Sequence, residues 1–491
     1  MRQPFLIVAT ATLLSGCNLA PVYVRPAPPV APSFPTGPAY GPAASGTQTP
    51  LAWRDVFTDP SLRTIIDRAL TNNRDLRAAV ANIASARAQY RVQRASQLPT
   101  ISASGGPSLS RGGNTTGGID SYSADVGVSG FEIDLFGRLK NLSKAAFETY
   151  LGTEAGARNT RLALIAETAT AYATLAADQD LLAVAQDTVA STARSLRLTR
   201  SLNDAGLTGK VDVRSIETTN AQSRSDVENA TTQVAQDRNT LELLVGAPVE
   251  AALLPGKLDT LEAGIAKVPV GVSSEVLLRR PDVIEAEHQL IGANANIGAA
   301  RAAFFPTITL TSAVGFASTA LSSLFTGGAF SWSGSSSASV PIFGGTNRGN
   351  LAYSVAQRDL YLAQYEKAVQ SAFREVADAL ARAGTIERQQ AAQADLLRAS
   401  SQANVLAEAR YREGIDTYLS ALVTQRTYYT ARQTKIATDL SALSNRVTLY
   451  QVLGGDSAGE GAGESAGSSL YPANLDRSAA RSDDPTPKPS R

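Results

Sequence analysis

Apolar and hydroxyl-bearing residues alternate strictly in four stretches of this chain. After Pro99, apolar side chains at 101, 103 and 109 alternate with serine and threonine, and the stretch after Pro306 repeats the pattern. A period of two, with one apolar and one hydroxyl-rich face, is typical of strands that lie between lipid and water. Each stretch has about ten residues, the length that a tilted strand needs to cross a bilayer. The alternation predicts transmembrane strands over about 99–111, 121–136, 306–318 and 330–343.

Four aromatic residues in or beside these strands are candidates for the membrane interface. Aromatic side chains form girdles at both faces of a membrane-spanning sheet. The alternative is two soluble hairpins with a low-complexity linker, but the pattern recurs four times beside long helical stretches, which favours the membrane interpretation. The expected interface residues are Tyr122, Phe316, Phe330 and Trp332.

Helical periodicity fills most of the remaining sequence. Two stretches without proline, 138–203 and 348–413, follow the strand pairs, and each ends near a glycine, Gly206 or Gly414. Apolar positions recur at steps of three and four, as expected for a helix-packing stripe. These stretches predict two long helical hairpins. The further helices expected are one over about 61–97, one over about 282–304, and the returning helices over about 210–246 and 417–453.

The two halves of the chain have the same order of elements. Pro99 matches Pro306 and Phe136-Gly137 matches Phe343-Gly344 at a constant offset of 207 positions. Proline and glycine at a fixed offset are stronger evidence of duplication than similarity between alanine-rich helices. We therefore expect two repeats, over residues 51–270 and 271–454, each with a helix, a strand pair and a helical hairpin.

The N-terminus predicts export and lipid attachment. A basic residue precedes a short apolar run, Phe5 to Leu14, which is typical of a secretory signal peptide over residues 1–16. Leu14-Ser15-Gly16-Cys17 fits a lipobox, in which the thiol of Cys17 takes the lipid. The alternative is an ordinary signal peptide with an incidental free thiol. Residues 17–50 are rich in proline, alanine and glycine and predict a tether, and residues 455–491 predict a disordered tail.

Charge and residue counts exclude several classes of function. Lysine and arginine number 45 against 44 acidic residues, so no nucleic-acid partner is expected. Cys17 is the only cysteine and His288 the only histidine, and no metal-binding spacing or phosphate-binding loop occurs. We expect a protein that is not an enzyme and has no cofactor or metal, in which His288 serves packing or the surface.

Four membrane strands cannot close a barrel within one chain, and an open edge in lipid leaves backbone groups unsatisfied. Two chains would give eight strands and a filled interior, whereas three would give twelve and an aqueous lumen. The hydroxyl-rich faces favour the trimer. The predicted fold class is an α+β membrane protein whose homotrimer forms a 12-strand β-barrel continuous with a 12-helix periplasmic α-barrel.

Several short motifs together indicate a family. They lie at Cys17–Tyr23, Trp53–Phe57, Asn73–Leu76, Phe131–Gly137 and Leu278–Asp282. On these motifs, the chain resembles the TolC-like outer-membrane efflux channels, in particular their lipoprotein (NodT-like) branch, over roughly residues 14–454. The resemblance implies a passive trimeric conduit for toxic small molecules in the outer membrane of a Gram-negative bacterium. Its partners would be outer-membrane lipid, a periplasmic adaptor and an inner-membrane pump of the RND type. The alternatives are a type I protein-secretion duct and a periplasmic coiled-coil adaptor or scaffold lipoprotein.

The same resemblance implies a gate at the periplasmic helical tip. Asp416 matches an acidic ring position of the lipoprotein branch, and the alternative is that it caps the returning helix. Ser420 and Val423 stand where a second acidic ring would need aspartates. Side chains that could link neighbouring tip helices, or simply be solvated helix ends, are Asp212, Arg214, Tyr411 and Arg412.

Overall fold

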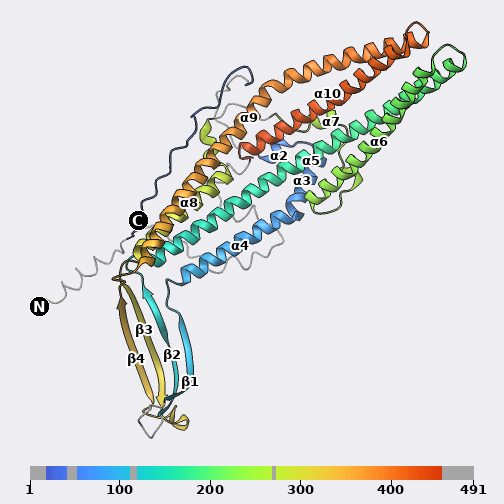
Figure 1. The fold of residues 1–491 in the computed structure, drawn as a ribbon. Coiled ribbons are helices and arrows are strands. Elements are labelled where there is room, and N and C mark those ends of the chain that lie inside the picture. Colours follow the sequence, from blue (N-terminus) through green and yellow to red (C-terminus); the bar gives the residue numbers. More distant parts are fainter. Residues whose placement is uncertain (1–17, 41–51, 111–118, 268–272, 456–491) are drawn as a thin grey trace. The chain divides into compact units, whose positions relative to one another are not determined.

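The computed structural model describes residues 18–40, 52–110, 119–267 and 273–455. The predicted signal peptide, Cys17 and almost all of the predicted C-terminal tail lie outside these residues. The described chain is mostly helical, with one four-stranded sheet (Figure 1). Its helices are α2 (Trp53–Val56), α3 (Pro60–Asn72), α4 (Arg74–Ala95), α5 (Arg138–Asp204), α6 (Lys210–Val245), α7 (Leu258–Glu262), α8 (Pro281–Ala302), α9 (Gly345–Arg412) and α10 (Tyr418–Val452). Its strands are β1 (Ile101–Ser110), β2 (Ile119–Ile133), β3 (Thr307–Ser318) and β4 (Phe330–Ser339), and three short 3-10 segments are η2 (Ala251–Leu253), η3 (Ser274–Arg279) and η4 (Leu321–Ser323).

Packing divides the chain into two compact units. The sheet unit contains residues 81–154 and 285–367 with the described residues up to 28, and the hairpin unit contains the rest of the described chain. Among the described residues, no helix combines the length and the apolar character needed to cross a membrane.

The sheet unit is built on four antiparallel strands in the order β1-β2-β3-β4. Its two hairpins, β1–β2 and β3–β4, are joined by the central pair β2–β3, in which Tyr122 lies opposite Ser318 and Ile133 opposite Ile308. The register shifts between Val128 and Phe131, at Gly130, whose φ of +63° suits glycine. Within the described chain, β1 and β4 each have one strand neighbour, so each leaves one edge unpaired.

The central strands approach each other very closely at two glycines. A Cβ atom added to Gly127 would lie 2.2 Å from the carbonyl oxygen of Ser312, and one added to Gly315 would lie 2.2 Å from that of Ala124. Both contacts involve backbone atoms, which cannot rotate away. These two positions therefore require glycine for steric reasons, although the φ angle at neither is positive.

Residues 18–28 form a strap along the helices of the sheet unit. The Asn141 side-chain amide donates to Asn18 Oδ1 at 2.9 Å, and that of Asn294 donates to the Pro21 carbonyl at 2.7 Å. Further along the strap, the Arg25 guanidinium donates two bonds, of 2.7 and 2.6 Å, to the buried carboxylate of Glu287 on α8. Asn18, the first residue of the strap, directly follows Cys17. The bond between Asn18 and Asn141 therefore fixes the chain next to the predicted lipidation site.

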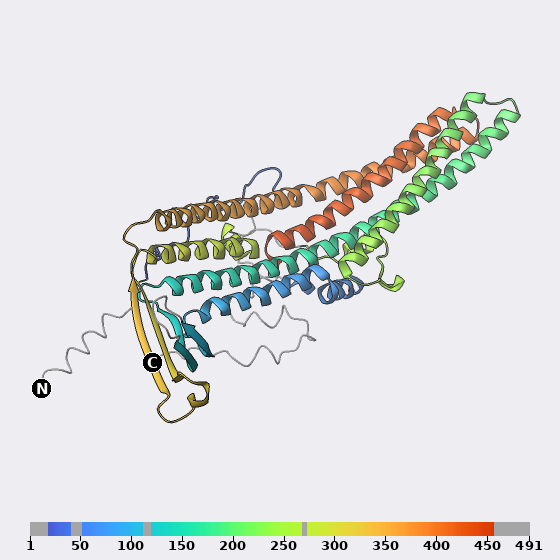
Figure 2. The same ribbon diagram turned by 60° about the horizontal axis from the view of Figure 1, so that its bottom comes forward.

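The hairpin unit contains most of α5 and α9, of 67 and 68 residues, and the returning helices α6 and α10 (Figure 2). No proline interrupts these helices, so their backbone hydrogen bonds continue. The core of the unit includes Phe57, whose ring meets that of Tyr450 edge-on at 5.5 Å between centroids.

The single helix expected over 61–97 is wrong, because the chain breaks into α3 and α4 at Asn73. Asn73 has an extended ψ of 135°, and its Oδ1 accepts a bond of 2.9 Å from the backbone N–H of Leu76. Its Nδ2 donates to the Leu244 carbonyl at 3.0 Å. The side chain thus caps α4 and ties the break to the end of α6.

A buried guanidinium fixes the start of α8. Arg280 donates to both carboxylate oxygens of Asp282, at 3.1 and 2.7 Å, and to Glu375 Oε2 at 2.8 Å. It also donates to the Val452 carbonyl at 3.0 Å. One side chain therefore joins α8, α9 and the end of α10, all within the hairpin unit.

Candidate functional site: the turns at the helical tip

The helical hairpins α5–α6 and α9–α10 end in two turns with the same backbone. Gly206 and Gly414 follow the first helix of each hairpin with φ of +73° and +69°. The next residue bonds back over the helix end, from Leu207 N to the Leu202 carbonyl at 2.8 Å and from Ile415 N to the Arg410 carbonyl at 2.9 Å. This pattern satisfies the last carbonyls of a helix and needs a left-handed residue, which explains both glycines.

An ion pair closes the second turn. Arg410 Nε donates to Asp416 Oδ2 at 2.5 Å, and Nη2 donates to Oδ1 at 3.3 Å. The hydrogen bond from Arg410 lowers the pKa of Asp416 below its ordinary value, so the carboxylate stays charged at neutral pH. The capping alternative for Asp416 is wrong, because the N-cap of α10 is Thr417 and no side chain caps that helix. The geometry leaves Asp416 as a charged, paired group at the turn.

The first turn is closed by different side chains. The Thr208 hydroxyl donates to Asp212 Oδ2 at 2.5 Å, and Asn203 Nδ2 donates to the Thr208 carbonyl at 2.8 Å. Asp212 therefore stabilises the entry of α6. Arg214 pairs with Glu217 at 2.7 Å, also on α6, so both expected link residues bind locally.

Tyr411 connects α9 to its neighbours. Its hydroxyl lies 2.8 Å from the hydroxyl of Thr199 on α5, and its ring meets that of Tyr418 edge-on at 5.6 Å. Ile216 on α6 completes this buried cluster. The two hairpins are therefore packed together just behind their turns, whereas Arg412 pairs with Glu408 on its own helix at 3.3 Å.

Three of the expected interface aromatics lie at the far end of the sheet, away from the helices (Figure 1). Phe316 lies opposite Phe330, and their rings meet edge-on at 6.3 Å between centroids. Tyr122 lies at the same end, opposite Ser318. Trp332, opposite Val314, is 77% exposed within the single chain. Phe330, two positions away on the same face of β4, is 62% exposed, and a contiguous patch of exposed apolar side chains is typical of a protein or membrane contact surface.

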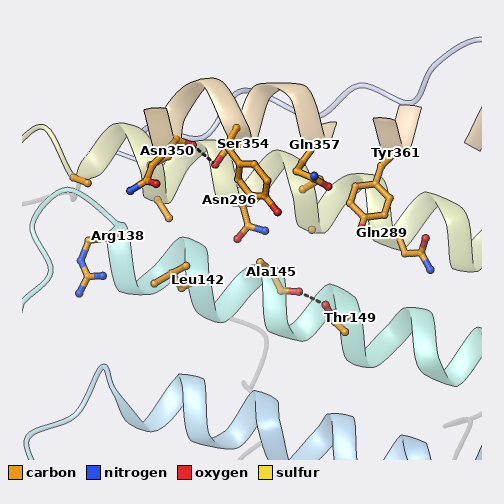
Figure 3. A pocket seen from close by; sticks show the side chains of 16 residues that line it. Arg138, Leu142, Ala145, Thr149, Gln289, Asn296, Asn350, Ser354, Gln357 and Tyr361 are labelled. Atoms are coloured by element: carbon orange, nitrogen blue, oxygen red, sulfur yellow. Dashed lines mark hydrogen bonds between the residues drawn. The ribbon is translucent and has the colours of Figure 1, made fainter. Parts of the chain in front are cut away.

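A hollow of about 600 Å³ lies between α5, α8 and α9 in the sheet unit (Figure 3). Carboxamide and phenol groups surround a floor of alanine and glycine, and the hydroxyls of Thr149 and Ser354 bond back to their own helices. No acidic side chain is among the described residues that line it. The carboxamide and phenol groups are those of Gln289, Asn296, Asn350, Gln357, Tyr353 and Tyr361, and the guanidinium of Arg138 also lines the hollow.

The only histidine lies between two helices of the sheet unit. His288 Nδ1 on α8 is 2.8 Å from Glu148 Oε2 on α5, and Gly152 leaves space beside its side chain. In the described residues, no group of three or more histidine, cysteine or acidic side chains could hold a metal ion.

Comparison with known proteins identifies the family. The profile of the outer membrane efflux protein family matches residues 65–247 and again 272–455. The chain belongs to the outer membrane efflux protein family. It is 44% identical to the probable efflux pump outer membrane protein TtgC of Pseudomonas putida over 91% of this chain and 94% of that protein. A membrane protein crystal structure from Pseudomonas aeruginosa matches with a TM-score of 0.80 and 37% identity, over 89% of this chain and 98% of that one. The open-state MtrE outer membrane channel of Neisseria gonorrhoeae matches with a TM-score of 0.80 and 34% identity, over 90% and 98%.

This outer membrane efflux protein does not gather all its predicted tip residues into one site. Tyr411 reaches another helix, whereas Asp212, Arg214 and Arg412 bind near their own turns or helices. Two functional partners were missed from the sequence, Arg410 and Thr199. Arg410 could have been found, because it lies only six positions before Asp416, on the other side of the glycine turn. Thr199 lies 212 residues from Tyr411 and leaves no local signal.

Proposed function

We propose that this efflux protein is the passive outer-membrane conduit of a tripartite pump, assembled as a homotrimer and gated at its helical tip. In the family, such proteins transport rather than catalyse, and the relatives carry efflux pump names. The observation that supports the trimer most is the sheet, whose β1 and β4 edges are unpaired within the described chain. Backbone groups on such edges cannot be left in lipid, so neighbouring chains would close a twelve-strand barrel. The twelve-helix cylinder would continue it into the periplasm.

Planar-bilayer conductance of the full-length protein tests the conduit. We expect detergent-stable trimers that change their gel mobility on heating and that conduct ions when inserted. A monomer that inserts no conducting pore would contradict both the trimer and the conduit. A periplasmic adaptor and an RND-type inner-membrane pump would be its partners, which crosslinking at the tip followed by co-purification would identify.

We also propose that Cys17 carries a lipid anchor. The lipobox before Cys17 and the strap that starts at Asn18 support it. Cys17→Ser, exported with an unrelated cleavable signal, should reduce the outer-membrane fraction several-fold, because the lipid is lost. The loss should be incomplete, because one acylated residue supplies only part of the membrane affinity. Membrane fractionation and intact mass measure this, and Ser15→Ala, which keeps a small residue in the lipobox, is the control. Equal sorting of the serine variant, or a wild-type mass without lipid, would refute the anchor.

The gate proposal rests on the Arg410–Asp416 pair. Under threefold symmetry, three Asp416 carboxylates would lie near the axis, where they attract cations. Asp416→Asn removes this charge and the bonds that close the turn, so we expect a several-fold rise in open conductance or a weaker block by divalent cations. Single-channel recording measures both. The control is Arg412→Gln, which removes a charge at the same tip and whose contact among the described residues is with Glu408 on the same helix. Unaltered conductance and block in Asp416→Asn would remove Asp416 from the gate.

A further inference from the structure

A carboxylate on α6 is buried without a full set of partners. Asp237 is 9% exposed, and its Oδ1 accepts a bond of 2.9 Å from Gln233 Nε2. Its other oxygen, Oδ2, is shielded from solvent and receives no bond from an amide, hydroxyl or basic group of the described residues. A buried charged oxygen without a donor is costly, so this group marks a place where a proton or a cation binds.

The group that faces it is a second carboxyl, Asp178 on α5. A proton held between the two carboxyls would let them share a hydrogen bond, since two ionised carboxylates have no donor. Burial, this bond and the charge of Asp237 together raise the pKa of Asp178 to about 7. Asp178 is therefore the carboxyl at this site that takes up a proton near neutral pH.

Two hollows in the hairpin unit adjoin this pair, one on each side. The first, of about 410 Å³, is lined by Asp237, Glu167 and apolar side chains that include Leu244. The second, of about 510 Å³, is lined by Asp178, Asp226 and Tyr429. Both volumes lie within the range of small-molecule sites. The helices α5 and α6 that carry most of these residues run side by side (Figures 1 and 2).

The charged side chains that line the two hollows are all acidic. No lysine or arginine is among the described residues that line either hollow. The Tyr429 hydroxyl on α10 is hydrogen-bonded to Asp226. The guanidinium of Arg432, whose charge also affects Tyr429, forms an ion pair with Asp187 at an N–O distance of 3.0 Å. A guest with one positive charge and an apolar body would match these walls, since its charge meets a carboxylate and its body meets alanine, leucine and threonine methyl groups.

We propose that the α5–α6 groove at Asp178 and Asp237 binds an organic ammonium ion, which replaces the proton that the two carboxyls share. The ammonium N–H groups would donate to the two carboxylates, and the released proton would pass to solvent. A bare metal ion fits less well, because the described residues offer no group of three or more ligands of the acidic, histidine or cysteine type. This site is independent of the proposed conduit, since it concerns binding and not flux.

Binding of 1-naphthylmethylammonium to the full-length protein in detergent tests the proposal. Equilibrium dialysis, with the same detergent on both sides, should show saturable binding that the neutral analogue 1-naphthylmethanol does not reproduce. The amine keeps its charge at pH 6 and pH 8, whereas Asp178 takes up its proton in this window. Affinity should therefore be about tenfold higher at about pH 8 than at about pH 6, as a pKa of about 7 requires.

Two substitutions and a matched control separate the site from general effects. Asp237→Asn should weaken binding on the order of tenfold or more, because a charge-assisted contact is lost. Asp178→Asn should also weaken it and should abolish the difference between the two pH values. The control Asp395→Asn removes an exposed carboxylate on α9 that pairs only with Arg398 on the same helix among its described contacts, and should leave binding unaltered.

Unchanged heat-modifiable trimers in each variant verify folding. Absence of saturable amine binding, equal binding of the alcohol, or unaltered affinity in both groove variants would overturn the proposal and leave the conduit untouched.

Discussion

Gly127→Ala should disrupt the pairing of β2 with β3 and sharply reduce the yield of heat-modifiable, folded protein. The new Cβ would lie 2.2 Å from the Ser312 carbonyl oxygen and 2.7 Å from the Ala313 Cα, whereas carbon–oxygen contacts between strands need about 3.3 Å or more. The strands would have to separate by roughly 1 Å, which lengthens the ladder bonds beyond their normal range. In the proposed membrane barrel, each backbone group left unpaired in lipid would cost several kcal/mol, so even a methyl group should have a large effect.

The measurement is the fraction of protein that changes gel mobility on heating, with circular dichroism of the strand signal as a second readout. Gly106→Ala provides a matched control. It lies in the same sheet, in β1, and a Cβ added there would meet no atom within 4 Å. Equal loss in both variants would show that general strand propensity, and not the close approach of β2 and β3, determines the outcome.

Arg280→Met should lower the free energy of unfolding by roughly 2–3 kcal/mol, less than a fully buried pair would lose because both carboxylates are about one third exposed. Methionine fills much of the same volume but leaves Asp282, Glu375 and the Val452 carbonyl without their shared donor. Arg280→Lys should recover only part of the loss, because an ammonium cannot reproduce the planar fork.

Urea unfolding of the detergent-solubilised protein measures this effect. Arg279→Met is the control, because the neighbouring arginine is exposed and its loss removes the same charge. If both methionine variants unfold at the same urea concentration as the wild-type protein, the guanidinium bridge between α8, α9 and α10 contributes nothing to stability.

Local signals in the sequence were enough to predict where helices and strands begin and end. Features that depend on contacts between residues far apart in the sequence could not be predicted. Proline after a helix and glycine at a helix end act within a few residues, which is why the turns at Gly206 and Gly414 could be located. The break at Asn73 could not, because its side chain gains from the Leu244 carbonyl, 171 positions away. The capping role considered for Asp416 was wrong because Arg410 bonds its carboxylate instead.

The candidate site was predicted in part for the same reason. Tyr411 was expected to link neighbouring helices, and its partner Thr199 could be identified only in three dimensions. Asp178 and Asp237 carry no signal in the sequence, because two carboxylates on separate helices are indistinguishable there from ordinary solvated charges. The lipid on Cys17, the gate role of Asp416 and the trimer stay predictions.

The central strand pair also has a consequence for biogenesis. Each hairpin, β1–β2 and β3–β4, closes over a short stretch, but Tyr122 pairs with Ser318 across almost two hundred residues. Closing so long a loop is entropically costly and slow compared with forming the hairpins. We therefore expect the first hairpin to leave the translocation channel with a bare β2 edge and to wait for β3. For an exported chain, we expect a periplasmic chaperone to shield this edge from other chains during that wait, so defects in such a chaperone should reduce the amount of this protein before they affect its activity.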